Sequence, residues 1–119
     1  MLVRYLVNQT NYKMKTPTKF ITQVDHLITT QPANKKLLRL LSGHFQLSNS
    51  QIYRKIKRIT GKSPSKYIRQ KRLEIAKELI EHSDLTLTEI SKQVGFQQLP
   101  YFSRCFSEYF GKTASSLRK

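Results

Sequence analysis

The stretch LSNSQIYRKIKRITGKSPSKYIRQKR, residues 47–72, decides how this chain folds. Ser48 is a favoured helix N-cap, and the side chain of Gln51 can return a hydrogen bond to the backbone of the cap residue. Apolar residues then recur at helical spacing and would face a core: Ile52, Ile56 and Ile59. The cations between them point the other way: Arg54, Lys55, Lys57 and Arg58. The pattern predicts a helix over about residues 49–60 that packs on one side and can meet a polyanion on the other.

The second half of the stretch begins another helix. Gly61 suits a helix end, Ser63 suits an N-cap, and Pro64 suits the first helical position. Apolar periodicity then continues to about residue 82, which predicts a long, rod-like helix. Its start is again basic: Lys66, Arg69, Lys71 and Arg72.

The chain has 119 residues and a formal charge of +15, and nearly all of the excess lies in the first part. Residues 1–72 carry 16 Lys and Arg against one acid, Asp25, whereas residues 73–119 carry six basic and six acidic residues. Such asymmetry favours a polyanionic partner, with nucleic acid ahead of an anionic membrane. No apolar run approaches the ~20 residues that a membrane span needs, so we expect no membrane partner.

Several other classes of protein are disfavoured by the residue types present. The lone cysteine, Cys105, cannot form an internal disulfide, which indicates a reducing, cytoplasmic compartment. His26, His44 and His82 lack metal-ligand spacing with one another or with Cys105, so we expect no metal. The sequence has no glycine-rich phosphate loop, paired catalytic carboxylates or nucleophile–base set. We therefore expect a non-enzyme with no cofactor and no small-molecule ligand.

Further helices are expected from periodicity and breaker residues, over about residues 18–30, 35–44, 86–94 and 99–110. Residues 113–119 could add a last turn. Residues 1–17 predict a weakly ordered leader, although LVRYLV alternates enough for a short strand.

Two segments of the chain look like copies of one another. The run LSGHFQLSNSQIYRKI from Leu41 aligns with ISKQVGFQQLPYFSRCF from Ile90, with one extra residue in the second turn. Each copy is a short helix, a tight turn and a helix that carries an outward arginine, Arg54 in the first and Arg104 in the second. That is the pattern of a helix-turn-helix, whose second helix enters the DNA major groove.

The segments LSNSQIYRKIKRITGKSP, YIRQKRLEIAKELI and VGFQQLPYFSRCFSEYFGKT together resemble the DNA-binding domain of AraC/XylS-family bacterial transcription regulators. The first unit is particularly similar to the output domains of hybrid two-component regulators. The resemblance implies an all-α fold of about seven helices, with two tandem helix-turn-helix subdomains joined by a long linker helix. The expected order is a leader, a first subdomain, a linker helix and a second subdomain, over residues 1–17, 18–62, 63–83 and 84–119.

The sequence also departs from the family pattern. Gln46 stands in the first turn where the family usually has glycine, and Gly43–His44 interrupt the preceding helix. The last motif reads TASSLR rather than TPSEYR, which predicts a weaker final helix. Pro100 fits only in the first turn of its helix.

The resemblance places nine residues at groove-facing positions as candidates for reading bases: Ser50, Gln51, Tyr53, Arg54, Gln98, Leu99, Tyr101, Ser103 and Arg104. Arginine suits bidentate recognition of guanine. Each assignment has an alternative. Arg54 could contact phosphate, Arg104 could pair with Glu108, and Gln51 could be used in its capping box. Tyr101 could pack on the rod, and Gln98 could face solvent.

A second set would serve phosphates, which supply affinity rather than specificity: Ser48, Lys55, Lys57, Arg58, Lys62, Lys66, Arg69 and Arg72. A run of cations is usually a solvated face, but no acid interrupts residues 26–73. Three functions follow from this pattern. They are a sequence-specific regulator of transcription that also contacts RNA polymerase, a nonspecific or architectural nucleic-acid binder, and an adaptor whose second unit binds polymerase. A sensor domain could lie outside this chain.

Overall fold

The computed structural model describes residues 17–118, and over these residues it contains helices and no strands. In chain order the elements are α2 (Pro17–Thr30), α3 (Leu37–Phe45), α4 (Asn49–Thr60), α5 (Pro64–His82), α6 (Leu87–Gln93), α7 (Leu99–Phe110) and the 3₁₀ turn η1 (Ser115–Leu117). The all-α prediction is therefore confirmed, with six α-helices and one 3₁₀ turn in the described part. The predictions for residues 1–16 lie outside the described residues.

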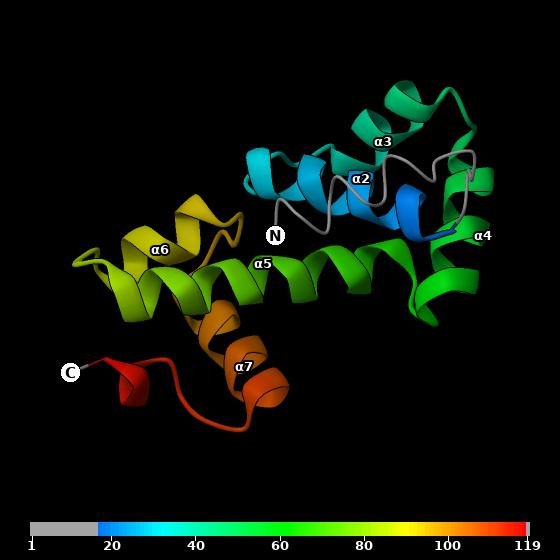
Figure 1. The fold of residues 1–119 in the computed structure, drawn as a ribbon. Coiled ribbons are helices and arrows are strands. Elements are labelled where there is room, and N and C mark those ends of the chain that lie inside the picture. The colour runs from blue at the N-terminus through cyan, green and yellow to red at the C-terminus, as the bar shows by residue number, and fades with distance from the viewer. Residues whose placement is uncertain (1–16, 119) are drawn as a thin grey trace.

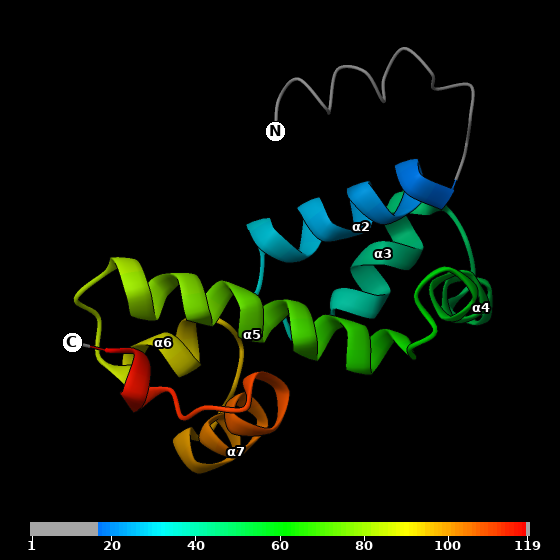
Figure 2. The same cartoon turned by 60° about the horizontal axis from the view of Figure 1, so that its bottom comes forward.

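The helix α5 is a straight rod along which the other helices are arranged (Figure 1). The helices α2, α3 and α4 gather around its N-terminal half, whereas α6, α7 and η1 gather around its C-terminal half. Figure 2 shows the same division from a second direction. With 19 residues, α5 is about 28 Å long at 1.5 Å per residue.

Each half of the rod supports its own hydrophobic core. In the first unit Ile68 of α5 packs with buried side chains of α2, α3 and α4: Phe20, Val24, Ile28, Leu37, Leu41, Ile52 and Ile56. In the second unit α5 contributes Leu73, Ala76 and Ile80, and these pack with Ile90, Val94, Phe96, Phe102, Cys105, Phe106 and Ala114. The core changes from the first unit to the second between Ile68 and Leu73.

Local capping chemistry sets most helix ends. A capping box begins α4 at Ser48 and another begins α6 at Thr86, and Ser63 caps α5 ahead of Pro64. Gly61 and Gly111 end α4 and α7 in the left-handed conformation. These ends were readable in the sequence because each depends on residues within one helical turn.

The first helix-turn-helix differs from the sequence prediction at α3. This helix starts at Leu37 rather than at residue 35, and it continues through Gly43 and His44 to Phe45. Its path through Gly43 and His44 agrees with the expected helix over about residues 35–44, because a single glycine weakens a helix without breaking it. Gln46 then takes the left-handed conformation with φ 56°, the one non-glycine residue in the described part to do so.

Candidate nucleic-acid interface

The outer face of α4 carries the first set of candidate base-reading residues. Ile52 and Ile56 are fully buried, which fixes the rotation of the helix and leaves Ser50, Tyr53 and Arg54 exposed. Tyr53 is 47% exposed, unusually much for a large ring. Ser50, Tyr53 and Arg54 line one shallow cleft with Leu38 and Asn49, so the fold brings them together on one surface.

Gln51, another base-reading candidate on α4, also takes part in the capping box that begins this helix. Its side-chain oxygen accepts a hydrogen bond from the Ser48 backbone N–H at 2.9 Å, and the Ser48 hydroxyl accepts one from the Gln51 backbone N–H at 3.1 Å. The capping-box alternative is therefore confirmed. The amide NH₂ of Gln51 remains a donor for DNA, whereas its oxygen is already engaged.

The second set lies on α7 and at its N-cap: Gln98 at the N-cap and Tyr101 and Arg104 on the helix are exposed. The Arg104 guanidinium lies over the Tyr101 ring, 5.3 Å from the centroid, and this cation–π contact orients both side chains. The expected alternative pairing of Arg104 with Glu108 is not among the ion pairs of residues 17–118. Ser103 is partly buried.

Leu99 differs from the other groove-facing candidates because it packs against the second core. It opens α7 and is only partly exposed. Its apolar side chain serves the fold of the second unit, so we do not retain it among the base-reading candidates.

The candidate phosphate ligands follow α4 and the start of α5. Arg58 and Lys66 are exposed, and Lys57 is exposed with its ammonium 3.4 Å from the Gly61 carbonyl oxygen. Lys55 lies over the Phe20 ring at 5.1 Å, and Lys62 donates a hydrogen bond to the Gln70 side chain. No ion pair within residues 17–118 involves these cations, so no acidic side chain offsets the charge of this surface.

Arg72 does not fit the phosphate set in which the sequence placed it. Its Nε donates to the Pro32 carbonyl at 2.7 Å, and its second guanidinium nitrogen donates to the Asn34 carbonyl at 2.9 Å. Burial lowers the pKa of this guanidinium. Because its donors already serve the backbone of the first unit, we no longer assign Arg72 to DNA phosphates.

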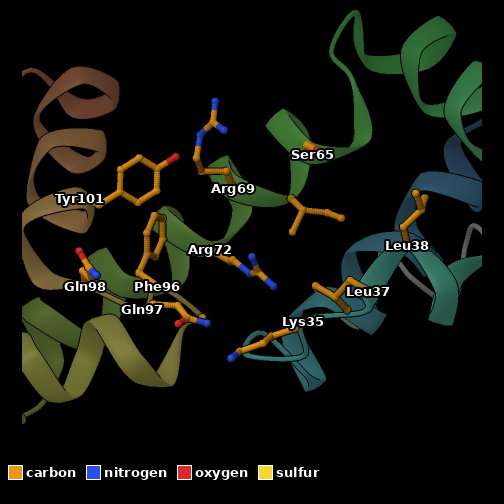
Figure 3. A pocket seen from close by; sticks show the side chains of 12 residues that line it. Lys35, Leu37, Leu38, Ser65, Arg69, Arg72, Phe96, Gln97, Gln98 and Tyr101 are labelled. Carbon is orange, nitrogen blue, oxygen red and sulfur yellow. The ribbon is translucent and has the colours of Figure 1, made fainter.

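A cleft of about 500 Å³ separates the two units on the side of α5 where Arg69 emerges. Figure 3 shows Lys35 and Leu37 from the first unit on one side, and Phe96, Gln98 and Tyr101 from the second on the other. Arg69 and Tyr101 also line a second cleft that extends to Lys66 and Arg104. The structure therefore brings several predicted residues from both units to one region. It adds Lys35 and Gln97, which no sequence signal marked.

The one acidic residue of the first 72 is neutralised on another side of the rod. The Asp25 carboxylate accepts a hydrogen bond from the Tyr67 hydroxyl at 2.6 Å and lies 3.6 Å from the Lys71 ammonium. Burial and this carboxylate raise the pKa of Tyr67. Asp25 thus stabilises the packing of α2 on α5.

The cysteine is a core residue, and the described residues offer no metal-binding cluster. Cys105 is buried in the second core, as expected of a small apolar side chain. Residues 17–118 contain no cluster of three or more His, Cys, Asp or Glu that could hold a metal ion. None of the helices in that range combines the length and apolarity that crossing a bilayer requires.

Comparisons with known proteins agree with this architecture. A family model described as a helix-turn-helix domain matches residues 41–119. The Msm operon regulatory protein of Streptococcus mutans is 33% identical over 100 residues, which is 84% of this chain and 36% of that protein. This chain therefore spans only about a third of that relative's length.

Two solved structures illustrate the similarity. The C-terminal domain of the two-component response regulator yesN from Fusobacterium nucleatum is 29% identical with a TM-score of 0.70, over 82% of this chain and 96% of that one. A transcriptional regulator from Chromobacterium violaceum, described as containing an AraC-type DNA-binding domain, has a TM-score of 0.78 at 24% identity, over 85% and 90% of the two chains. From the matched model, the relatives and the paired helix-turn-helix units on one rod, it follows that this chain belongs to the AraC/XylS family of transcription regulators and carries the family's DNA-binding fold.

Proposed function

We propose that this chain binds duplex DNA at specific sequences through α4 and α7 and regulates transcription from the bound site. The observation that carries the proposal is the presence of two exposed arginines, Arg54 and Arg104, on equivalent helices of two units that share one rod. Each unit buries one face of its recognition helix, α4 or α7, and leaves the opposite face free to enter a major groove.

The base-reading residues we propose are Ser50, Gln51, Tyr53 and Arg54 on α4, with Gln98, Tyr101, Ser103 and Arg104 on or beside α7. An arginine that bonds guanine in two places contributes about 1–3 kcal/mol of discrimination. The Arg104 guanidinium is exposed and lies over the Tyr101 ring, and this contact orients it for a base contact.

The phosphate ligands we propose are Ser48, Lys55, Lys57, Arg58, Lys62, Lys66 and Arg69. They surround the first recognition helix and are expected to supply most of the affinity through counterion release. One rod carries both recognition helices, and adjacent major grooves on one face of B-DNA lie one helical turn, about 34 Å, apart. We therefore expect an asymmetric site of two short elements about one turn apart, bound in successive major grooves.

In vitro selection from a random duplex library tests the proposal. A selected site with two unlike elements supports it, whereas a palindromic site would mean a dimer that uses one recognition helix per chain. Nonspecific or architectural binding is the second candidate, favoured by the charge of +15. A steep salt dependence with no preference for the selected site over a scrambled duplex would establish that alternative.

Two variants separate base reading from phosphate contact. Arg54→Ala should reduce the preference for the selected site over a scrambled site by about 1–3 kcal/mol. Arg58→Ala, one turn along the same helix, should weaken both sites alike and reduce the slope of log K against log salt by about one. Equal loss of discrimination in both variants would contradict the assigned roles.

The proposed function also includes a compartment and partners for the chain. The chain would act without enzymatic activity, in the cytoplasm, under control of a sensor domain and in contact with RNA polymerase. The balanced charge of residues 73–119 leaves room for an adaptor role of the second unit. In that case Arg104→Ala would leave DNA affinity unchanged while it abolished activation in a reporter assay.

A further inference from the structure

The two units meet at a small joint around Arg72, at the point where the core along α5 changes from one unit to the next. Ile68 belongs to the first core and Leu73 to the second, and Arg72 lies between them on the rod. The main packing of the helices in each unit is on one another and on α5. We therefore expect the relative orientation of the two units to depend on the contacts that Arg72 makes at this point of α5.

On the side of the first unit, Arg72 is held by the loop that joins α2 to α3. Its guanidinium donates to the carbonyls of Pro32 and Asn34 at 2.7 and 2.9 Å. The loop is itself tied together, because the Asn34 backbone N–H and side-chain NH₂ both donate to Gln31 and the Lys36 backbone N–H donates to the Asn34 side chain. A cation that bridges two carbonyls of a braced loop fixes the rod to the first unit.

On the side of the second unit, the turn after α6 touches the same groups. A Cβ at Gly95 would lie 2.7 Å from the Pro32 carbonyl oxygen and 2.9 Å from Arg72 Nε, and φ at Gly95 is +98°. Both the backbone conformation and the space exclude a side chain there. The turn is anchored to its own unit, since the Phe96 N–H donates to the Ser91 carbonyl at 2.8 Å. Figure 3 shows Arg72 reaching from α5 toward the first unit, with Phe96 and Gln97 of the second unit beside it.

We propose that the joint formed by Arg72, the Pro32–Asn34 carbonyls and Gly95 holds the two recognition helices at one separation and rotation, and so determines which spacing between the two DNA elements the protein accepts. Arg72 is thus a positioning residue for specificity rather than a DNA ligand. This inference rests on the proposed function, because spacing has meaning only where both α4 and α7 read DNA.

The physical basis is the rigidity of the duplex. One inserted base pair moves the second element by about 3.4 Å and rotates it by roughly 35°. If the two recognition helices are fixed relative to one another, they cannot both fit the major grooves of the altered site. At least one base contact is then lost, which costs at least about tenfold in affinity. A protein with a loose joint follows the displaced element and shows little preference.

The test compares affinities for the selected site with affinities for the same site after one base pair is inserted or deleted between its elements. We expect the full chain to prefer the native spacing by about tenfold or more, and Arg72→Ala to prefer it by about threefold or less. Arg72→Lys keeps the positive charge but lacks the planar fork, so it should behave like Arg72→Ala. Preservation of the wild-type spacing preference in Arg72→Ala would overturn the inference, and so would full rescue by lysine.

Arg69→Ala provides the matched control, since Arg69 lies one turn earlier on the same helix and lines the clefts that face the proposed interface. It should weaken all three spacings by the same factor and leave the preference intact. A change of preference in Arg69→Ala equal to that in Arg72→Ala would show that any lost cation has this effect, and would refute the special role of Arg72.

The rigidity of the joint can also be measured without DNA. Residual dipolar couplings from residues 17–62 and from residues 84–118 should fit one alignment tensor in the wild-type chain and two different tensors in Arg72→Ala. Two tensors in the wild type, or one tensor in a folded Arg72→Ala, would overturn the inference. If the wild type shows no sequence-specific binding, the proposed function fails while this result still decides whether the joint is rigid.

Discussion

In the first helix-turn-helix a glycine, Gly43, lies inside a helix, whereas the left-handed position after that helix is occupied by Gln46. Gly43 lies inside α3, and a Cβ built there meets nothing within 4 Å. Gln46 follows the helix with φ 56° and ψ 44°, the conformation that glycine adopts most easily. We predict that the double substitution Gly43→Ala with Gln46→Gly stabilises the protein.

The expected gain is the sum of two backbone terms. Replacing a glycine by alanine in an exposed helix interior is worth about 0.5–1 kcal/mol. Relieving the left-handed strain at Gln46 gains about 1–2 kcal/mol, from which the greater freedom of glycine in the unfolded chain removes about 0.4–1 kcal/mol. The double variant should therefore gain about 0.5–2.5 kcal/mol in the free energy of unfolding, and its Tm should rise by about 2–10 °C.

Urea unfolding followed by far-UV circular dichroism measures this gain as a higher midpoint at an unchanged m-value. Gly61→Ala is the control, because its Cβ also meets nothing within 4 Å but its φ is +78°. The same change of side chain should there lower stability by about 1 kcal/mol. A loss of stability in Gly43→Ala or in Gln46→Gly would refute the helical path through Gly43 or the left-handed turn.

Three further predictions concern other parts of the chain. Thr86→Ala removes the side-chain acceptor that begins α6 and should lower the free energy of unfolding by about 1 kcal/mol in a urea titration, whereas Thr88→Ala on the same exposed turn should change it little. Burial and Asp25 raise the pKa of Tyr67, so its stabilisation is present below the ordinary tyrosine value of about 10 and is lost as the pH rises beyond it, because the unfolded chain releases the phenol proton first. Unfolding measured between about pH 9 and 11 should accordingly show a smaller loss of stability in Tyr67→Phe than in the wild type. Cys105 is buried, so a thiol reagent should modify it far more slowly in the native protein than in urea, and equal rates would contradict its place in the core.

The sequence was sufficient to predict the elements that local chemistry defines. The expected helices over about residues 49–60, 64–82 and 99–110 match α4, α5 and α7 in the structure. Each is bounded by a cap, a proline or a glycine that lies next to the helix end, so no distant contact is needed to place it. The exposed face of α4 followed from the same periodicity, because burying Ile52 and Ile56 leaves only one orientation for Arg54.

The role of Arg72 could not be predicted from the sequence. It sits among cations that continue around the outer surface of the rod, and nothing in the local pattern distinguishes it from Arg69. Its carbonyl partners lie 40 and 38 residues away, and the loop that supplies them has no motif of its own. Leu99 is a similar case, because the family resemblance placed it at a groove-facing position, whereas in the structure it packs against the aromatic core of the second unit.

The uneven charge of the two units explains why the joint would matter most for the second. Residues 73–119 carry no net charge, so this unit gains little from counterion release and would bind DNA weakly by itself. In the proposed mode of binding, its affinity in the full chain would depend on the first unit, which carries the uncompensated cations of α4 and would hold the second unit at a high effective concentration near its DNA element. That advantage is greatest when the connection is stiff and its geometry fits the site, and it disappears when the geometry forbids simultaneous contact. The proposed joint would therefore allow the electrostatic attraction of the first unit to DNA to support sequence discrimination by the second.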